Sequence, residues 1–207
     1  MNASRLGSRG FTIIELMVTV AVMMVLLAIA QPSFEGLRQR SALRGSAEQV
    51  LSFWNQARLE AAKRNQMVKV GAIFGSGAAF CLGAATTTNP ADDIPCDCTT
   101  AAPSDATLTC DIARFPGDQS EWKRVTLSGM TLGGGTFISD MEPTVIEPKR
   151  TNLVVPGDAG SISLSGPPGH FAYKVNMRVD RFGRAMLCES QNATHHLSDY
   201  GSRVCAD

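Results

Sequence analysis

Cysteine is the residue type in this chain most able to form cross-links or to hold a metal ion. The chain has 207 residues and six cysteines, which is more than a reduced cytosolic protein of this size usually carries without a metal site. All six lie after position 80, at Cys81, Cys96, Cys98, Cys110, Cys188 and Cys205. The six cysteines therefore indicate either a metal site or disulfides formed in an oxidising compartment.

A zinc site and an enzyme active site are the two alternatives to disulfides. Cys96 and Cys98 are one residue apart rather than the usual two, and the adjacent His195 and His196 cannot easily aim at one ion. The serines, histidines and aspartates have no G-x-S-x-G or H-E-x-x-H motif around them. We therefore expect disulfides, with no metal, no cofactor and no enzymatic activity. Cys96 and Cys98 are too close to favour each other, which leaves Cys81 and Cys110 to take one each, in an order that stays open.

A single carboxylate in an apolar segment is the second feature that points to chemistry. Residues 11–30 carry only one charged side chain, Glu15, and as a helix they would span roughly 30 Å, the thickness of the hydrocarbon core of a bilayer. A carboxylate at that depth costs about 2.5–3.5 kcal/mol, so an intramembrane acid is a functional candidate. The alternative is that Glu15, one turn from the helix start, only reaches the interface.

The ten residues before this segment are polar and basic. They carry Arg5 and Arg9 and no acid, which favours a cytoplasmic N-terminus and export of the rest of the chain. A secretory signal peptide would have a shorter apolar region, followed by a small-x-small cleavage site. Here Gln31 and Pro32 follow the apolar run, and the small residue Gly10 precedes it. The pattern therefore differs from that of a signal peptide.

This arrangement resembles the type IV prepilin motif, with Gly10 at the junction, Phe11 next and Glu15 at the fifth position of an apolar helix. The resemblance implies that a membrane-bound prepilin peptidase cuts after Gly10 and methylates the new amino group of Phe11. The apolar helix would stay in the product. In this family the glutamate is thought to attract the N-terminal ammonium of a neighbouring subunit. Pro32 falls where members often carry a helix-kinking proline.

The helical period continues to residue 66, and a strand-rich pattern follows it. One apolar stripe with polar residues on the other faces is formed by Leu37, Leu43, Ala47, Val50, Leu51, Trp54, Ala57 and Ala61. Short strand-like runs bounded by turn residues lie at 67–74, 107–115, 122–129, 135–139, 144–148, 152–156, 160–166, 171–180 and 184–190. Residues 83–106 are expected to form a loop.

These patterns predict an α+β protein in which one long helix packs on an antiparallel, β-rich domain. The apolar fraction of 44% is sufficient for a core, and the net charge of zero excludes a strongly basic nucleic-acid coat. We divide the chain into a leader, a transmembrane helix, its amphipathic continuation and a disulfide-linked β-rich domain, at 1–10, 11–31, 32–66 and 67–207.

The strand-rich region and the C-terminal run FGRAMLC (182–188) resemble the GspH/FimT group of minor pilins and pseudopilins. The resemblance implies a disulfide between Cys188 and Cys205. It also implies a subunit of a type IV pilus or a type II secretion pseudopilus, in the bacterial inner membrane with a single pass and its globular domain in the periplasm. Its partners would be the prepilin peptidase, other major and minor pilins or pseudopilins, and membrane lipid.

A DNA-binding minor pilin for natural transformation is the alternative function. Arg178, Arg181 and Arg184 fall within seven residues, and a turn at 180–183 would gather them at one end of a hairpin. Related minor pilins bind DNA through a G-R-x-R element, of which this chain keeps Gly183-Arg184 and replaces the second arginine with Met186. Loss of the leader removes two of 19 basic residues and none of 19 acidic ones. We therefore expect DNA binding to be weak, because it depends on neutralising several phosphates.

Overall fold

The structure is a computed structural model that describes residues 11–74, 80–100, 102–116, 125–134, 143–166, 173–195, 197, 200 and 203–205, without the side chains of 31–33, 134 and 156. It has one long helix followed by two sheets built mainly of antiparallel strands, which confirms the predicted α+β class. The chain divides into two compact units, Met1–Arg38 and Gln39–Asp207. The second unit therefore contains the C-terminal half of the helix together with the sheets.

Helix α1 runs from Ile13 to Arg64. In the second unit its predicted stripe is buried, with no exposed area at Leu43, Ala47, Val50, Trp54, Ala57 and Ala61. Leu37 was assigned to the same stripe, but its side chain is exposed, because a separation of six residues from Leu43 puts it on a different face of the helix. The bend predicted at Pro32 lies outside the residues whose side chains are described.

The first sheet has four antiparallel strands in the order β3-β2-β1-β5. Their bounds are Met67–Phe74 for β1, Phe80–Thr87 for β2, Ala113–Phe115 for β3 and Thr144–Ile146 for β5. Strands β1 and β2 form a long hairpin ladder, from Met67 opposite Thr87 to Phe74 opposite Phe80. Strand β2 contains Cys81, and the segment that follows it contains Cys96, Cys98 and Cys110.

The second sheet has five strands in the order β4-β6-β7-β8-β9. Their bounds are Thr126–Met130 for β4, Gly160–Ser165 for β6, Lys174–Val179 for β7, Ala185–Ser190 for β8 and Val204–Cys205 for β9. All neighbours are antiparallel except β8 and β9, which are parallel. Short 3-10 turns lie at Ala106–Leu108, Leu132–Gly134 and Pro156–Asp158.

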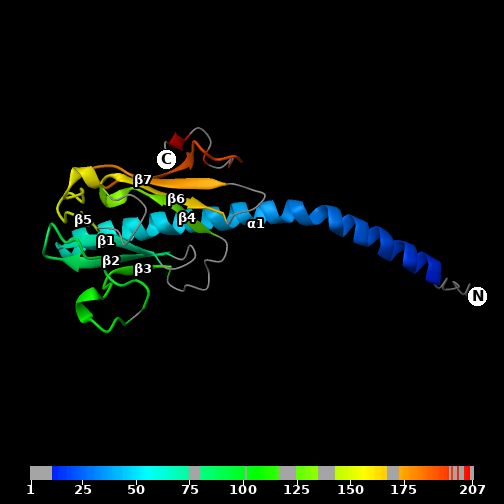
Figure 1. The fold of residues 1–207 in the computed structure, drawn as a ribbon, viewed down its shortest axis with the longest axis horizontal. Helices are drawn as coiled ribbons and strands as arrows, with labels where there is room; N and C mark the ends of the chain where they lie inside the picture. Colours follow the sequence, from blue (N-terminus) through cyan, green and yellow to red (C-terminus); the bar gives the residue numbers. More distant parts are fainter. Residues whose placement is uncertain are drawn as a thin grey trace, which may run out of the picture. The chain divides into compact units, whose positions relative to one another are not determined.

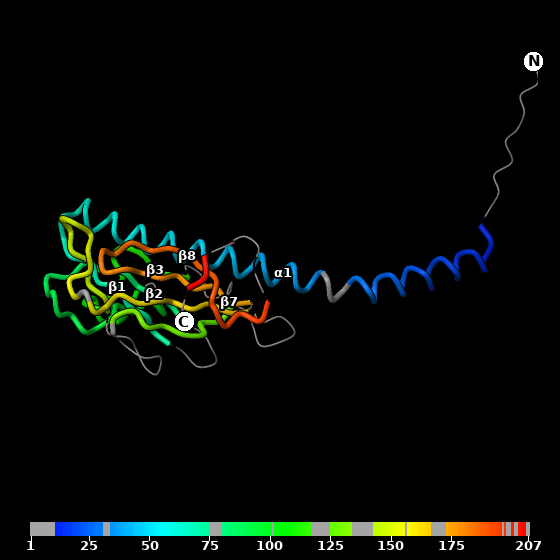
Figure 2. Tube along the Cα trace, turned by 90° about the horizontal axis from the view of Figure 1, so that it is seen from above, coloured from blue at the N-terminus to red at the C-terminus, as the bar shows by residue number. Residues whose placement is uncertain are grey.

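A single apolar core joins the C-terminal half of α1 to both sheets. The cluster includes Trp54 of the helix, Val70 and Leu82 of the first sheet, and Leu164 and Met177 of the second. The second half of α1 runs along both sheets (Figure 1) and, in the view from above, beside the β7–β8 hairpin (Figure 2). The helix stripe therefore stabilises the sheets by removing apolar surface from water.

Several predicted strand boundaries were wrong. Residues 83–87 were assigned to a loop but complete strand β2. The run 107–115 was predicted to be one strand, yet only 113–115 form a strand, because Asp105 caps a 3-10 turn at the start of the run and Thr109 makes only an isolated bridge to Asp97. In the run 152–156, Leu153 makes only an isolated bridge to Ile146. The predicted strand at 135–139 lies outside the described residues.

Candidate functional site

The first candidate site is the start of α1, where the apolar segment begins. Thr12 caps the helix: its hydroxyl accepts a hydrogen bond from the backbone N–H of Glu15, 3.2 Å away. A threonine cap followed by glutamate at the third helical position is a capping-box sequence that orients the first turn. The sequence reading missed Thr12, although the T-x-x-E spacing was visible. The Phe11 side chain is 80% exposed, and Gly10 lies outside the described residues.

Apart from Thr12 and Thr19, the side chains around Glu15 on the helix are apolar. The large side chains from Ile13 to Ile29 are all exposed. Among the described residues, α1 is the helix that is long and apolar enough to cross a membrane, by length and composition. The Glu15 carboxylate has no ion pair within the described part of the chain, although it lies near the positive end of the helix dipole. This segment needs lipid or other helices to cover it.

The second candidate site is the disulfide framework of the β-rich unit. Cys81 is bonded to Cys98 and Cys96 to Cys110, with Cα–Cα distances of 5.8 and 5.2 Å. Cys188 is bonded to Cys205, the pair that the resemblance implied. With their sulfurs in disulfides, Cys96 and Cys98 cannot act as zinc ligands. Among the described residues, no three His, Cys, Asp or Glu side chains gather as metal ligands would.

Gly83 shows how closely the central disulfides approach strand β2. A Cβ atom at this position would lie 2.5 Å from the Sγ atoms of both Cys96 and Cys110. Such a distance is shorter than any contact between carbon and sulfur, so only glycine fits here without a shift of the disulfide or the strand. The cross-linked segment is therefore pressed directly onto the sheet.

A buried ion pair ties the same segment to strand β1. The Lys69 ammonium lies 3.1 Å from a carboxylate oxygen of Asp92 and donates a hydrogen bond to the Ile94 carbonyl at 2.8 Å. Burial acts to raise the pKa of Asp92, but hydrogen bonds from Thr87, Lys69 and the Ile94 N–H and the lysine charge outweigh it and leave the pKa below its ordinary value. The carboxylate is therefore ionised at neutral pH and matches the buried ammonium.

The third candidate site is the turn between β7 and β8. The side chains of Arg178, Arg181 and Arg184 are all exposed there. The guanidinium carbons of Arg181 and Arg184 lie 4.9 and 5.4 Å from the centre of the Phe182 ring. The structure therefore places the three predicted arginines near one end of the hairpin, and two of them, Arg181 and Arg184, lie over an aromatic side chain that sequence reading had not singled out.

Asp180 reduces the charge of this turn and fixes its shape. Its carboxylate accepts hydrogen bonds at 2.9 Å from the backbone N–H and the Nε of Arg184. Burial acts to raise the pKa of Asp180, but the hydrogen bonds and charge of Arg184 and the Phe182 N–H outweigh it and leave the pKa below its ordinary value. Arg184, the residue on which the DNA-binding alternative depends most, is thus already paired within the turn.

The turn is anchored to the helix through Gly183. This residue has a left-handed φ of 69°, and a Cβ atom would lie 2.4 Å from the Thr151 carbonyl oxygen. Its own carbonyl accepts a hydrogen bond of 2.8 Å from the buried indole Nε1 of Trp54. Trp54 lies 15 residues into the second unit, about 22 Å along the helix from its start. The basic turn therefore lies at the end of this unit far from Gln39.

Comparison with known families identifies the N-terminal segment. Residues 5–31 match the family model of the prokaryotic N-terminal methylation motif. Comparison with curated proteins and with solved structures gives no match. The motif indicates a type IV pilin or pseudopilin processed by a prepilin peptidase, and proteins of this class are structural rather than enzymatic. Together with the long apolar helix and the β-rich unit, this match supports a type IV pilin-like protein.

Proposed function

We propose that this chain is a minor subunit, of the GspH/FimT group, that initiates or supports assembly of a type IV pilus or a type II secretion pseudopilus at or near the filament tip. Two features support a place in a larger assembly. The apolar half of α1 has no cover within the described part of the chain, and the strand-rich unit with its C-terminal disulfide resembles that group.

The observation that carries the proposal is Glu15 in the first turn of the exposed apolar segment. Its carboxylate is costly in lipid, at about 2.5–3.5 kcal/mol. An ammonium at the N-terminus of a neighbouring subunit would offset that cost only in the assembled state. Prepilin peptidase would create such an ammonium on Phe11. The charge therefore favours the filament over the free subunit in the membrane.

A substitution of Glu15 tests this proposal. We expect Glu15→Val to insert normally, because the change removes a charge from the apolar segment, and to be absent from sheared filaments on immunoblots. Thr19→Val is the matched control: it removes a polar group one turn further on, whose hydroxyl bonds only to the Leu16 carbonyl of the same helix. Incorporation of Glu15→Val at the wild-type level would contradict the charge-pairing role.

The filament system is to be found by deletion. We place the globular unit in the periplasm, because its disulfides need an oxidising compartment and Arg5 and Arg9 favour a cytoplasmic leader. Loss of twitching motility on deletion supports the type IV pilus, and loss of extracellular enzyme secretion supports the pseudopilus. If deletion changes neither, the assembly role is wrong.

Binding of DNA is the second candidate function, and the exposed arginines of the β7–β8 turn favour it. Against it stand the pairing of Arg184 with Asp180, the replacement of the second family arginine by Met186, and the net acidic charge after processing. Since each neutralised phosphate releases counterions, three arginines give binding that falls steeply with salt. We therefore rank DNA binding below the assembly role.

Fluorescence anisotropy with the mature chain in detergent distinguishes the two functions. We expect binding of duplex DNA only at low ionic strength. Binding at physiological salt, or loss of natural transformation on deletion, would support the DNA-binding function. Micromolar affinity at physiological salt that is lost in Arg184→Gln, and kept in the control Arg150→Gln, would make DNA binding the leading function.

A further inference from the structure

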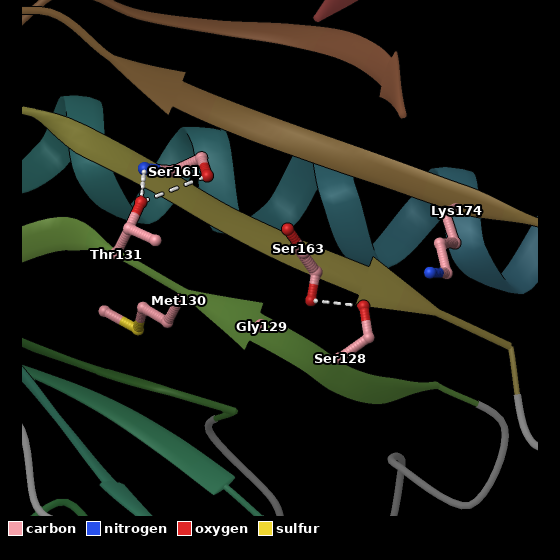
Figure 3. A pocket seen from close by; sticks show the side chains of 7 residues that line it. All are labelled: Ser128, Gly129, Met130, Thr131, Ser161, Ser163 and Lys174. Carbon is pink, nitrogen blue, oxygen red and sulfur yellow. Dashed lines mark hydrogen bonds between the residues drawn. The ribbon is translucent and has the colours of Figure 1, made fainter. Parts of the chain in front are cut away.

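A small polar depression lies on the second sheet, at its β4 edge and away from the candidate sites described above. Its volume is about 180 Å³, and Figure 3 shows the residues that line it: Ser128, Gly129, Met130, Thr131, Ser161, Ser163 and Lys174. Strand β4 is bulged here, because the pairing with β6 shifts between Leu127 and Gly129. Bulges of this kind are common beside binding sites, where they redirect side chains.

Hydroxyl groups form most of the polar wall of the depression. The Thr131 and Ser161 hydroxyls lie 3.3 Å apart, and the Ser128 hydroxyl donates to the Ser163 carbonyl at 3.2 Å. Ser163 is 9% exposed, and its hydroxyl is not among the fully buried polar atoms that lack a partner. It is therefore accessible to the hydroxyl or carbonyl of a ligand.

Lys174 supplies a cation at the same place. It pairs with Ser165 across the β6–β7 ladder, so it shares a sheet face with Ser163 as a diagonal neighbour. Cβ atoms in that relation are about 7–8 Å apart, within reach of a lysine side chain. The Lys174 ammonium has no ion pair or hydrogen bond within the described part of the chain, and no acid lines the depression. The site therefore has an uncompensated positive charge.

Gly129 keeps the floor of the depression open. A Cβ atom at this position would lie 3.7 Å from the Cβ and Oγ of Ser163, which is an ordinary contact. Packing therefore does not require glycine here, unlike at Gly83. The depression as a whole, with its volume of about 180 Å³, has room for roughly six waters at about 30 Å³ each. That is more room than a lone carboxylate or phosphate needs, and it suits one sugar ring.

We propose that this depression binds one acidic sugar residue. Lys174 binds the anionic group, either the carboxylate of a uronic acid or the phosphate of a sugar phosphate. The hydroxyls of Ser163, Ser161 and Ser128 exchange hydrogen bonds with the sugar hydroxyls. The chain would thus contact an acidic polysaccharide, a function separate from the assembly role of Glu15.

Saturation-transfer difference NMR on the mature full chain tests this proposal, in a detergent without a sugar or phosphate headgroup. The observed probes are glucuronic acid, glucose 6-phosphate and glucose, and inorganic phosphate, which has no carbon-bound proton to observe, is added as a competitor of the acidic sugars. We expect at least one acidic sugar to bind with a Kd of about 1 mM, which is typical of a single small contact site. Glucose and inorganic phosphate should each bind at least tenfold more weakly. The stronger of the two acidic sugars identifies the anionic group.

Three variants tie the binding to this depression. Lys174→Gln should weaken the acidic sugar at least tenfold and leave glucose unchanged, whereas Gly129→Ala should weaken every sugar. Lys149→Gln, at an exposed lysine elsewhere, should change nothing. Near-UV circular dichroism checks that the variants are folded. If Gly129→Ala does not fold, Lys174→Gln alone still tests the proposal. Equal binding of phosphate and acidic sugar, binding that survives Lys174→Gln, or no binding of any probe would overturn the proposal.

Discussion

The two halves of α1 share one backbone conformation and have opposite surroundings. Between Ile13 and Ile29 the large apolar side chains are exposed, whereas between Leu43 and Ala61 one face is fully buried against the sheets. The second half finds its partner within the chain, and the first half needs one from outside. The second half of the helix therefore stabilises the fold, whereas the first half is available for contacts outside the chain.

Among the changes that separate the two halves of α1, replacement of Trp54 should have the largest effect on the free energy of unfolding. Trp54→Ala removes a fully buried side chain and leaves the Gly183 carbonyl without its donor. We expect the free energy of unfolding to fall by about 4 kcal/mol, as measured by chemical denaturation in detergent. The matched variant Leu26→Ala, in the exposed half, should change it by less than about 0.5 kcal/mol. Equal losses in the two variants would show that the halves are not distinct.

Removal of the C-terminal disulfide should give the next largest loss in the free energy of unfolding. Cys188→Ser combined with Cys205→Ser opens a loop with a sequence separation of 17 residues. Chain-entropy estimates for a loop of that length predict a loss of about 3 kcal/mol in the free energy of unfolding. Peptide mapping without reductant checks the pairing in the wild type. Free thiols at both positions would refute it.

The buried pair between Lys69 and Asp92 should contribute less. Asp92→Asn leaves the ammonium buried but still bonded to the Ile94 carbonyl, so we expect a loss of about 2 kcal/mol at neutral pH, below the roughly 3–5 kcal/mol of an isolated buried charge. The pKa of Asp92 is lowered on folding, so its stabilisation is present above the unfolded value of about 3.9 and is lost as the pH falls through the lower folded value. Unfolding curves from pH 7 down to the acid range should therefore converge for the two proteins. A constant difference would contradict this assignment.

Changes on the exposed face of the second half of α1 should have the smallest effect on the free energy of unfolding. Arg44 and Glu48 form an ion pair of 2.9 Å with both side chains about half exposed. Glu48→Gln should change the free energy of unfolding by less than about 0.5 kcal/mol, since such pairs are screened by water and salt. A larger loss would mean that the polar face, and not only the buried stripe, holds the helix on the sheets.

Sequence reading predicted the parts of the molecule that depend on local pattern. The 3.6-residue period marked the stripe from Leu43 to Ala61, and the spacing of Gly10, Phe11 and Glu15 marked the segment that matches the N-terminal methylation motif. The turn residues at 180–183 also predicted that the arginines gather. Each of these signals lies within a short stretch of chain, where residue types alone determine the spacing.

Features that depend on distant contacts could not be predicted in this way. Strand β2 was assigned partly to a loop because Gly83 and Ala84 are poor strand formers, yet the small residue at 83 is required by the sulfurs of a distant disulfide. The bond from Trp54 to Gly183 joins residues 129 positions apart. Neither the pairing of Arg184 with Asp180 nor the polar depression beside Lys174 leaves a periodic signal in the sequence.

The exposed half of α1 should stay in the mature protein, with Phe11 as the first residue. Intact-mass measurement of the protein purified from membranes tests this directly. We predict the mass of residues 11–207 with three disulfides and one added methyl group, and accumulation of the full-length form when Gly10 is replaced by a bulky residue. A mature protein that begins after Ala30 would show that the apolar segment is an ordinary signal peptide, and would contradict a role for this segment in a filament.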